Sequence, residues 1–296
     1  MKSTLASLSA VLAFSLPTGA LAQSSFPTSA GDIVTQSANP SGMSIPNTAD
    51  GPAPEEAAEL AKKLNNPIAS LISVPFQLNY DTGLGETDAD RYVLNVQPVI
   101  PFELSEDWNL ISRTIVPFID LDSPIIGGSD TSGVGDIVQS FFFSPKAPTK
   151  GGWIWGAGPV LLLPTGKDEF SADNWGIGPT AVALKQENGW TYGGLVNHIW
   201  GIDDPSGDRD KTDQTFLQPF LGFTTPDAWS FFVNSESTYD WNGKEWTVPV
   251  NFSVSKLTHF GKQPVSFQVG YRNYLDAPSG GPDWGLRFNV TFLFPK

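Results

Sequence analysis

The stretch WGLRFNVTFLF, residues 284–294, alternates between large apolar side chains and small or polar ones along most of its length. This period of two is typical of a β-strand with one apolar face, because successive side chains of a strand point to opposite sides of the sheet. The apolar positions are Trp284, Leu286, Phe288, Val290, Phe292 and Phe294. So many large apolar residues on one face predict that this face meets either a protein core or lipid.

The same alternation recurs from residue 71 to the end of the chain. It is clear at 71–80, 246–255 and 265–273 and weaker in eight further segments. Together these segments give twelve candidate strands: 71–80, 91–103, 107–119, 133–144, 152–164, 175–186, 189–200, 214–223, 228–239, 246–255, 265–273 and 284–294. The spacing suits transmembrane strands of about ten residues, each followed by a loop.

Connector length and charge alternate along the chain as well. Long connectors are rich in Asp and Glu, as in DTGLGETDAD (81–90), GKDEFSAD (166–173) and DDPSGDRDKTD (203–213). The connectors between them are mostly shorter and carry lysines such as Lys146 and Lys256. An even number of antiparallel strands with long loops on one side is typical of an up-and-down barrel whose termini lie opposite those loops.

The ten Trp residues favour a membrane barrel over a soluble β-sandwich, which would show the same alternation. Nine of them lie at the ends of candidate strands: Trp108, Trp153, Trp175, Trp190, Trp200, Trp229, Trp241, Trp246 and Trp284. Such rows are typical of the aromatic girdles at the two membrane surfaces. We therefore predict an all-β fold, a transmembrane antiparallel up-and-down β-barrel of about 12 strands with a short N-terminal helix.

The N-terminus has the features of a secretory signal peptide. A basic residue precedes a short apolar run, and Ala20-Leu21-Ala22 matches a small-x-small cleavage site, which predicts a signal peptide at 1–22. The apolar run is too short to span a membrane as a helix. Residues 23–66 are then a flexible leader and short helix, and residues 67–296 form the barrel.

The short helix is predicted at 54–64, PEEAAELAKKL, because its acids lie in the first turn and its lysines in the last. The leader and this helix could enter the barrel as a plug or remain in the periplasm. The sequence leaves both arrangements open.

Composition excludes several classes of function. The chain has 31 acidic and 17 basic residues, a formal net charge of -14, so nucleic acid is not an expected partner. It has no Cys, which excludes disulfides, thiolate metal sites and a Cys nucleophile. Its two His, His198 and His259, show no metal-ligand spacing. We expect no cofactor, no metal site and no catalytic residues.

If the apolar faces of the strands meet lipid, the polar residues of opposite parity face the lumen. The lumen-facing candidates are Arg113, Asp136, Glu236, Gln268, Arg272, Arg287 and Asn289. Their charges either line a polar pore or form a salt-bridge network that braces the wall, and the sequence leaves both readings open.

Several ordered motifs carry a family resemblance. They include NPIASLISVPFQLNY (66–80), WNLISRTIVPFI (108–119), WGAGPVLLLPTG (155–166), WGIGPTAVAL (175–184) and YGGLVNHIW (192–200). Over about residues 65–296 the chain resembles the outer-membrane β-barrel family named for the MetA-pathway of phenol degradation, whose bacterial members are labelled transporters. The resemblance implies a barrel that passes small molecules, aromatic or hydrophobic compounds among them. It supplies no catalytic residues.

We expect an outer-membrane channel or transporter for the passive passage of small molecules, with both termini in the periplasm. The alternatives are a structural or adhesive barrel without transport and, from another class, an outer-membrane lipid hydrolase. The hydrolase is disfavoured because His198, the strand-borne His, has only Thr215 as a hydroxyl neighbour on the next strand.

The expected partners are small-molecule solutes, outer-membrane lipids and lipopolysaccharide. Divalent cations could bridge the acidic loops to lipopolysaccharide phosphates, since hard cations prefer oxygen ligands. The aromatic-ended last strand is the kind of signal that outer-membrane assembly machinery reads.

Overall fold

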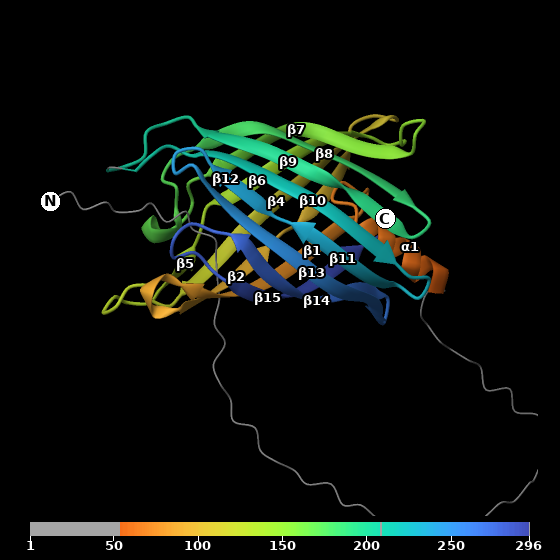
Figure 1. Cartoon of the computed structure of the whole chain (residues 1–296). Coiled ribbons are helices and arrows are strands. Elements are labelled where there is room, and N and C mark those ends of the chain that lie inside the picture. The colour runs from red at the N-terminus through yellow and green to blue at the C-terminus, as the bar shows by residue number, and fades with distance from the viewer. Residues whose placement is uncertain (1–53, 208, 296) are drawn as a thin grey trace, which may run out of the picture.

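A computed structural model describes residues 54–207 and 209–295, in which antiparallel strands close into a barrel with one short α-helix (Figure 1). The predicted signal peptide (1–22) and the leader as far as residue 53 lie outside the described residues. Helix α1 covers Pro54–Leu64 and has the predicted charge order, with acids first and lysines last. Among the described residues, no helix is both long and apolar enough to cross a membrane.

Fifteen strand segments make up the wall. Their bounds are β1 Ile72–Leu84, β2 Ala89–Val96, β3 Val99–Glu103, β4 Trp108–Leu121, β5 Thr131–Val134, β6 Ile137–Pro145, β7 Trp153–Leu163, β8 Gly176–Glu187, β9 Trp190–Gly201, β10 Asp213–Thr224, β11 Trp229–Ser235, β12 Ser237–Asp240, β13 Glu245–Phe260, β14 Gln263–Asp276 and β15 Trp284–Phe294. β2 and β3, β5 and β6, and β11 and β12 each share a neighbour and form one strand in two pieces, so the wall has the predicted twelve strands.

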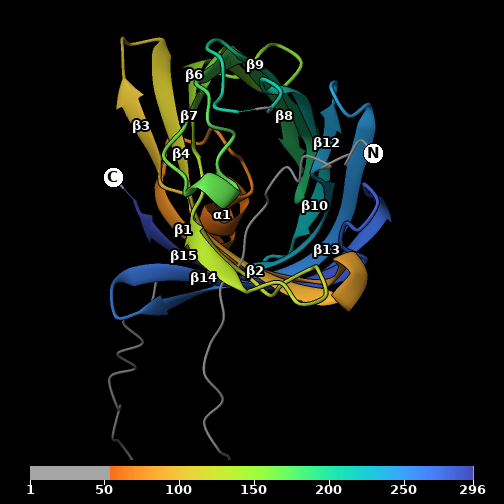
Figure 2. The same ribbon diagram turned by 90° about the vertical axis from the view of Figure 1, so that its left-hand side faces the viewer.

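The ring closes between the first strand and the last. β1 pairs with β15 from Ile72–Phe294 to Thr82–Trp284, and each remaining strand pairs with its neighbours in the chain. Figure 2 shows the strands as a ring seen along the barrel, and Figure 1 places α1 at one end of it. We call the two ends of the barrel the helix end, where α1 lies, and the long-loop end.

The two faces of the wall differ as the alternation predicts. Phe252 and Phe288 point outward and are 51% and 47% exposed, whereas Asn251 and Arg287, next to them in sequence, are 2% and 5% exposed. In a soluble sandwich the large apolar side chains would be the buried ones. The exposed apolar outer face therefore confirms a membrane β-barrel.

The Trp residues also lie where the girdle prediction places them. Trp108, Trp153, Trp190 and Trp229 are the first residues of β4, β7, β9 and β11. The nine Trp assigned to girdles are all between 37% and 51% exposed. They form rings of side chains at the ends of the outer wall, the positions that amphipathic aromatic rings prefer at a membrane surface.

Several strands extend past their predicted bounds, as β13 does to Phe260 with Lys256 inside it, and one extension matters for the interior. The sequence places Asp81 in an acidic loop at 81–90, but β1 continues to Leu84. Asp81 is 0% exposed and lies in register between Gly285 of β15 and Arg91 of β2. Composition alone assigns such a carboxylate to an acidic loop, because it does not show that the side chain points inward and pairs with an arginine.

The prolines inside strands coincide with irregularities of the wall. Pro98 separates β2 from β3, and the register of β13 shifts between Val248 and Pro249. Pro159 of β7 and Pro179 of β8 face each other in register. Because proline lacks the backbone N–H that a ladder needs, bulges and breaks at these positions are expected.

The lipid-facing assignment predicts the cost of a buried charge. We expect Phe252→Arg to lower the free energy of unfolding by roughly 2–4 kcal/mol, because the guanidinium would enter hydrocarbon. Urea unfolding in lipid vesicles, followed by Trp fluorescence, measures the loss. Phe260, at the end of the same strand and 63% exposed, is the control. Arg there should cost about 0–1 kcal/mol; an equal loss at both positions would contradict the assignment.

Candidate functional site in the barrel interior

Four of the five arginines in the chain lie on the inner face, one each on β2, β4, β14 and β15. The twelve strands thus gather most of the arginine in the sequence into one place, together with two carboxylates. We call Arg91, Arg113, Arg272, Arg287, Asp81 and Glu236 the arginine network. We did not predict from the sequence that Arg91 and its partner Asp81 face the lumen.

Asp81 is the centre of one half of the network. Arg91 donates a hydrogen bond from Nη2 to Asp81 Oδ2 at 3.0 Å, and Arg272 Nε lies 3.5 Å from Asp81 Oδ1. Tyr274 donates its hydroxyl to the same Oδ1 and accepts a hydrogen bond from Arg272, both at 2.9 Å. A Cβ at Gly285 would lie 2.7 Å from Asp81 Oδ1, so glycine leaves the space that this carboxylate occupies.

Glu236 is the centre of the other half. Arg287 binds it with both terminal nitrogens, at 2.9 Å to Oε1 and 2.7 Å to Oε2, and donates from Nε to Asn79 at 2.7 Å. Glu236 lies at the break between β11 and β12, whereas Arg287 is on β15, beyond β13 and β14. At about 4.8 Å per strand, this pair spans three strand spacings across the interior.

Arg113 differs from the other inward arginines. Its Nη2 donates to Gln97 Oε1 at 2.9 Å, and within the described residues it has no ion pair. It is only half-buried, and it lies on β4, six strand positions from Glu236 and so on the opposite side of the ring. Glu236 nevertheless interacts electrostatically with it.

The predicted amide residues lie beside the network. Gln268 and Asn289 are register partners on β14 and β15, and Gln268 donates to Ser253 Oγ at 3.0 Å. Within the described chain, Asn289 Oδ1 and both amide atoms of the nearby Asn251 are buried without a hydrogen-bond partner. This part of the inner wall is polar and carries spare hydrogen-bonding capacity.

Asp136 does not join the arginines. It accepts hydrogen bonds from the backbone N–H groups of Gly166 at 2.9 Å and Ala172 at 2.7 Å, both in the β7–β8 connector. Phe170, in the short 3-10 helix η2 (Asp168–Phe170) of that connector, is 5% exposed and packs on inward residues of β1, β2 and β4. Asp136 thus fixes a loop that folds back into the long-loop end.

The neighbouring connector is tied to that loop. Ser206 donates its backbone N–H to Asp173 at 2.7 Å, and Asp203 accepts from the backbone N–H of Trp175 at 2.6 Å. Hydrogen bonds from Ser206 hold the pKa of Asp173 below its usual value. The two acidic connectors at 166–173 and 203–213 are therefore linked to each other by their carboxylates.

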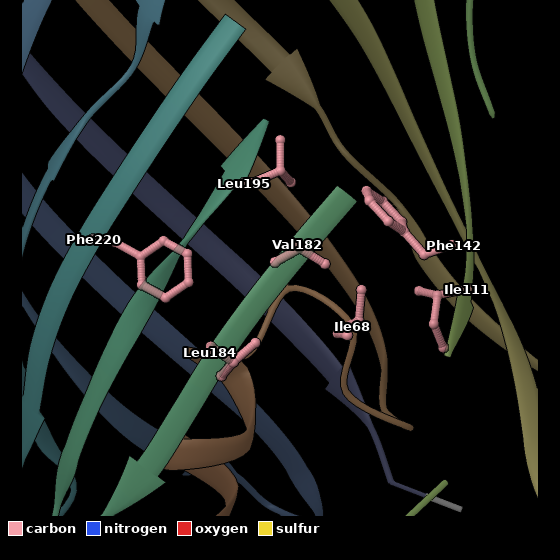
Figure 3. Packing of buried hydrophobic residues seen from close by; sticks show 7 residues of the cluster. All are labelled: Ile68, Ile111, Phe142, Val182, Leu184, Leu195 and Phe220. Atoms are coloured by element: carbon pink, nitrogen blue, oxygen red, sulfur yellow. The ribbon is translucent and has the colours of Figure 1, made fainter. Parts of the chain in front are cut away.

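At the helix end, the segment that follows α1 enters the barrel. Ile68 is 3% exposed and packs among inward residues of five strands (Figure 3). These residues are Ile111 of β4, Phe142 of β6, Val182 and Leu184 of β8, Leu195 of β9 and Phe220 of β10. Ile68 therefore lies inside the ring and fills part of the interior at this end.

Hydrogen bonds hold this segment around its perimeter. Asn65 donates to Thr224 Oγ1 at 3.1 Å and to Ser230 Oγ at 3.3 Å, and Asn109 donates to Ser70 Oγ at 2.7 Å. Gln186 donates to the Lys62 carbonyl at 2.7 Å. We call residues 54–71 the plug, because they are bonded to β4, β8, β10 and β11 at the helix end.

His198 lies on the outer wall, away from the network. Its Nδ1 is 2.7 Å from Thr215 Oγ1, and its Nε2 is 3.1 Å from Asp213. Trp241 donates to the same Thr215 hydroxyl at 2.9 Å, and the Trp200 ring centroid is 4.1 Å away. The Thr215 hydroxyl is thus shared between the imidazole and an indole in the aromatic girdle.

No group of His, Asp or Glu in the described part of the chain is arranged to hold a metal ion. Two solved structures align with the chain, and the first of them shares the fold. An outer membrane channel of Pseudomonas putida F1 aligns with a TM-score of 0.60 and 17% identity, over 76% of this chain and 96% of that one. The NanC porin aligns with a TM-score of 0.47 and 11% identity, over 75% of this chain and 100% of that one.

A family model described as "Putative MetA-pathway of phenol degradation" matches residues 73–296. No curated protein matches the sequence. The matched range begins within β1 and continues through β15, so it covers the barrel wall and leaves out the plug.

Proposed function

Since the chain belongs to the family of the MetA-pathway of phenol degradation and folds as an outer-membrane barrel, we propose that it is a passive outer-membrane channel for small molecules. The observation that carries this proposal is the contrast between the exposed apolar outer wall and the charged inner one. If the inward charges only braced a closed barrel, each of them could form an ion pair with another. Here Arg113 is half-buried and has no ion pair among the described residues.

The network gives the channel a preference for anions. It has four arginines and two carboxylates, although the chain as a whole carries a net charge of -14. Fixed positive charge in a narrow passage raises the local concentration of anions. The acidic loops lie outside, where salt screens them within about 8 Å at physiological ionic strength.

Bilayer conductance with a salt gradient tests both parts of this proposal. We expect discrete channels whose reversal potential shows weak anion preference, and Arg113→Gln should shift it toward cations.

Arg272 and Arg287 are buried in ion pairs, so they brace the wall, and replacing both should cost stability more than selectivity. Arg209, on an outer loop, is the matched control. Absence of channels would refute the function, and unchanged selectivity in Arg113→Gln would refute the role of that residue.

We further propose that both termini and the plug lie on the periplasmic side and the acidic loops outside the cell. Single Cys at Ser206 should react with a membrane-impermeant thiol reagent on intact cells, whereas Cys at Gly261, in the β13–β14 turn, should not. The chain has no native Cys, so the background is clean. The reverse labelling pattern would overturn this topology.

The same topology defines the proposed partners. The outer wall contacts membrane lipids, the linked acidic connectors face lipopolysaccharide, and the exposed last strand β15 is available to the assembly machinery before it pairs with β1. We propose no enzymatic role: the hydroxyl nearest His198 is a threonine that also accepts a hydrogen bond from Trp241.

A further inference from the structure

We propose that the β7–β8 connector, residues 164–175, is a lid that closes the long-loop end of the barrel and moves aside when a solute passes. Phe170 is the side chain that holds the lid in its closed position. The proposal deepens the channel function and rests on it only for the conductance test described below.

Phe170 packs far from the two strands that carry it. The wall runs in the order β1-β2-β4-β6-β7-β8, so β7 is two strand positions from β4 and four from β1. The buried residues around Phe170 nevertheless come from β1, β2 and β4, and they are Leu84, Ala89, Val93, Ile119 and Leu121. The connector therefore extends over the end of the ring. Figure 2, a view along the barrel, shows η2 as a short green helix in front of the middle of the ring.

The lid lies on the path to the arginine network. Ala89 and Val93 belong to the cluster around Phe170, and they flank Arg91 on the same face of β2. Arg91 is the ion-pair partner of Asp81, the centre of one half of the network. A solute that enters from the long-loop end therefore meets the lid before it reaches these charges.

Hydrogen bonds outside the strand ladders hold the lid to the rim. Asp136 accepts from the backbone N–H groups of Gly166 and Ala172, one near each end of the connector. The register between β7 and β8 ends at the pair Leu162 and Gly176, so neither bond belongs to that ladder. The lid can therefore leave the opening while the wall stays paired. Asp136 is a positioning residue for the lid.

A reversible disulfide tests whether the lid must move. A Cβ at Gly133 of β5 would lie 3.0 Å from Lys167 Cβ in the lid, close to the roughly 3.8 Å of a disulfide. The atom that would crowd it most is Lys167 Cδ, which the second substitution removes. In the variant Gly133→Cys with Lys167→Cys, oxidation should lower the channel conductance at least fivefold, and a reductant should restore it. Lys167→Cys alone, treated with the same oxidant, is the matched control and should not respond.

Thiol protection in detergent tests the lid without any conductance. Val93 is 0% exposed beneath Phe170, so Val93→Cys should react slowly with a charged thiol reagent. Adding Phe170→Asp should speed the reaction at least tenfold, because an unpaired carboxylate is disfavoured in the apolar cluster. Phe170→Leu keeps the apolar anchor and should stay slow. Asp136→Ala removes the two ties and should give an intermediate rate.

A second buried position separates lid opening from a general loosening of the barrel. Leu293 is also 0% exposed, in the cluster at the helix end, so Leu293→Cys should stay slow when Phe170→Asp is added. Phe170→Ala should speed the reaction of Val93→Cys at least threefold, and it keeps the test valid if the Asp variant does not fold. Acceleration at both buried positions counts against the lid.

Equal reactivity of Val93→Cys with and without the Phe170 substitutions overturns the lid. So does unchanged conductance in the doubly substituted protein once its disulfide has formed. Normal conductance that the disulfide does not alter refutes the lid alone. A protein that forms no channels, yet protects Val93→Cys until Phe170 is replaced, refutes the channel alone.

Discussion

Ile68→Asp should raise the single-channel conductance several-fold. The side chain is 3% exposed among inward residues of β4, β6, β8, β9 and β10, so a carboxylate there would lie unpaired in an apolar cluster. The cost of burying such a charge is several kcal/mol, and the apolar contacts of Ile68 are lost at the same time. The plug should leave the interior, and planar bilayer recordings would measure the wider passage.

Two controls separate plug release from damage to the wall. Ile68→Val keeps an apolar side chain and should conduct like the native protein. Asn65 Nδ2 and Thr224 Oγ1 are 3.1 Å apart. In the Ile68→Asp variant, a Cys pair at these two positions should hold the plug in place when oxidised and release it when reduced. If Ile68→Asp folds into a barrel of normal heat-modified mobility and its conductance is unchanged, the plug does not block the passage.

Glu236→Gln should lower the free energy of unfolding by about 3 kcal/mol, near the lower end of the range for a broken buried ion pair. The Arg287 side chain is 6% exposed and would keep its charge without its ionic partner, while Glu236 itself is 21% exposed. The same substitution removes a negative charge from the interior, so the reversal potential should move further toward anions. Urea unfolding in vesicles and bilayer recording measure the two effects.

Glu103→Gln is the matched control for this prediction. Its ion pair with Lys146 is 3.7 Å long and its side chain is 72% exposed, so the loss should stay within about 0.5 kcal/mol. The double variant Glu236→Gln with Arg287→Gln should lose less than the sum of the single losses, because no unpaired charge remains. Strictly additive losses would mean that the two residues do not stabilise each other.

The wall could be predicted from sequence because lipid imposes a simple rule on every strand. Residues that face lipid must be apolar, so Phe252 and Phe288 identify the outward face of their strands. Trp108 and Trp229 identify the strand ends that lie at a membrane surface. The interior follows no such rule. Asp81 sits in a run of acids and has the composition of a loop, yet its pairing with Arg91 and Arg272 extends β1.

The site was predicted in part for the same reason. The alternation of side chains along a strand identified Arg272 and Arg287 as inward. It does not give the distance between residues on different strands across the ring. The contact between Arg287 and Glu236 joins β15 to the break between β11 and β12, three strand positions away. Asp136 was grouped with the arginines, although it binds loop amides, because its loop partners follow it by about thirty residues.

The seam between β1 and β15 has a consequence for biogenesis. Asn79 and Arg287, hydrogen-bonded across it, are 208 positions apart in the chain, and Tyr274 and Asp81 are 193 apart. Until the last strand has been synthesised and delivered, Asp81 and Arg91 lack Arg272 and the open sheet has a free edge at β1. Loop-closure entropy disfavours so distant a pairing. Ion pairing at the seam therefore stabilises only the complete chain. A truncated barrel gains little stability from partial closure and stays accessible to proteases.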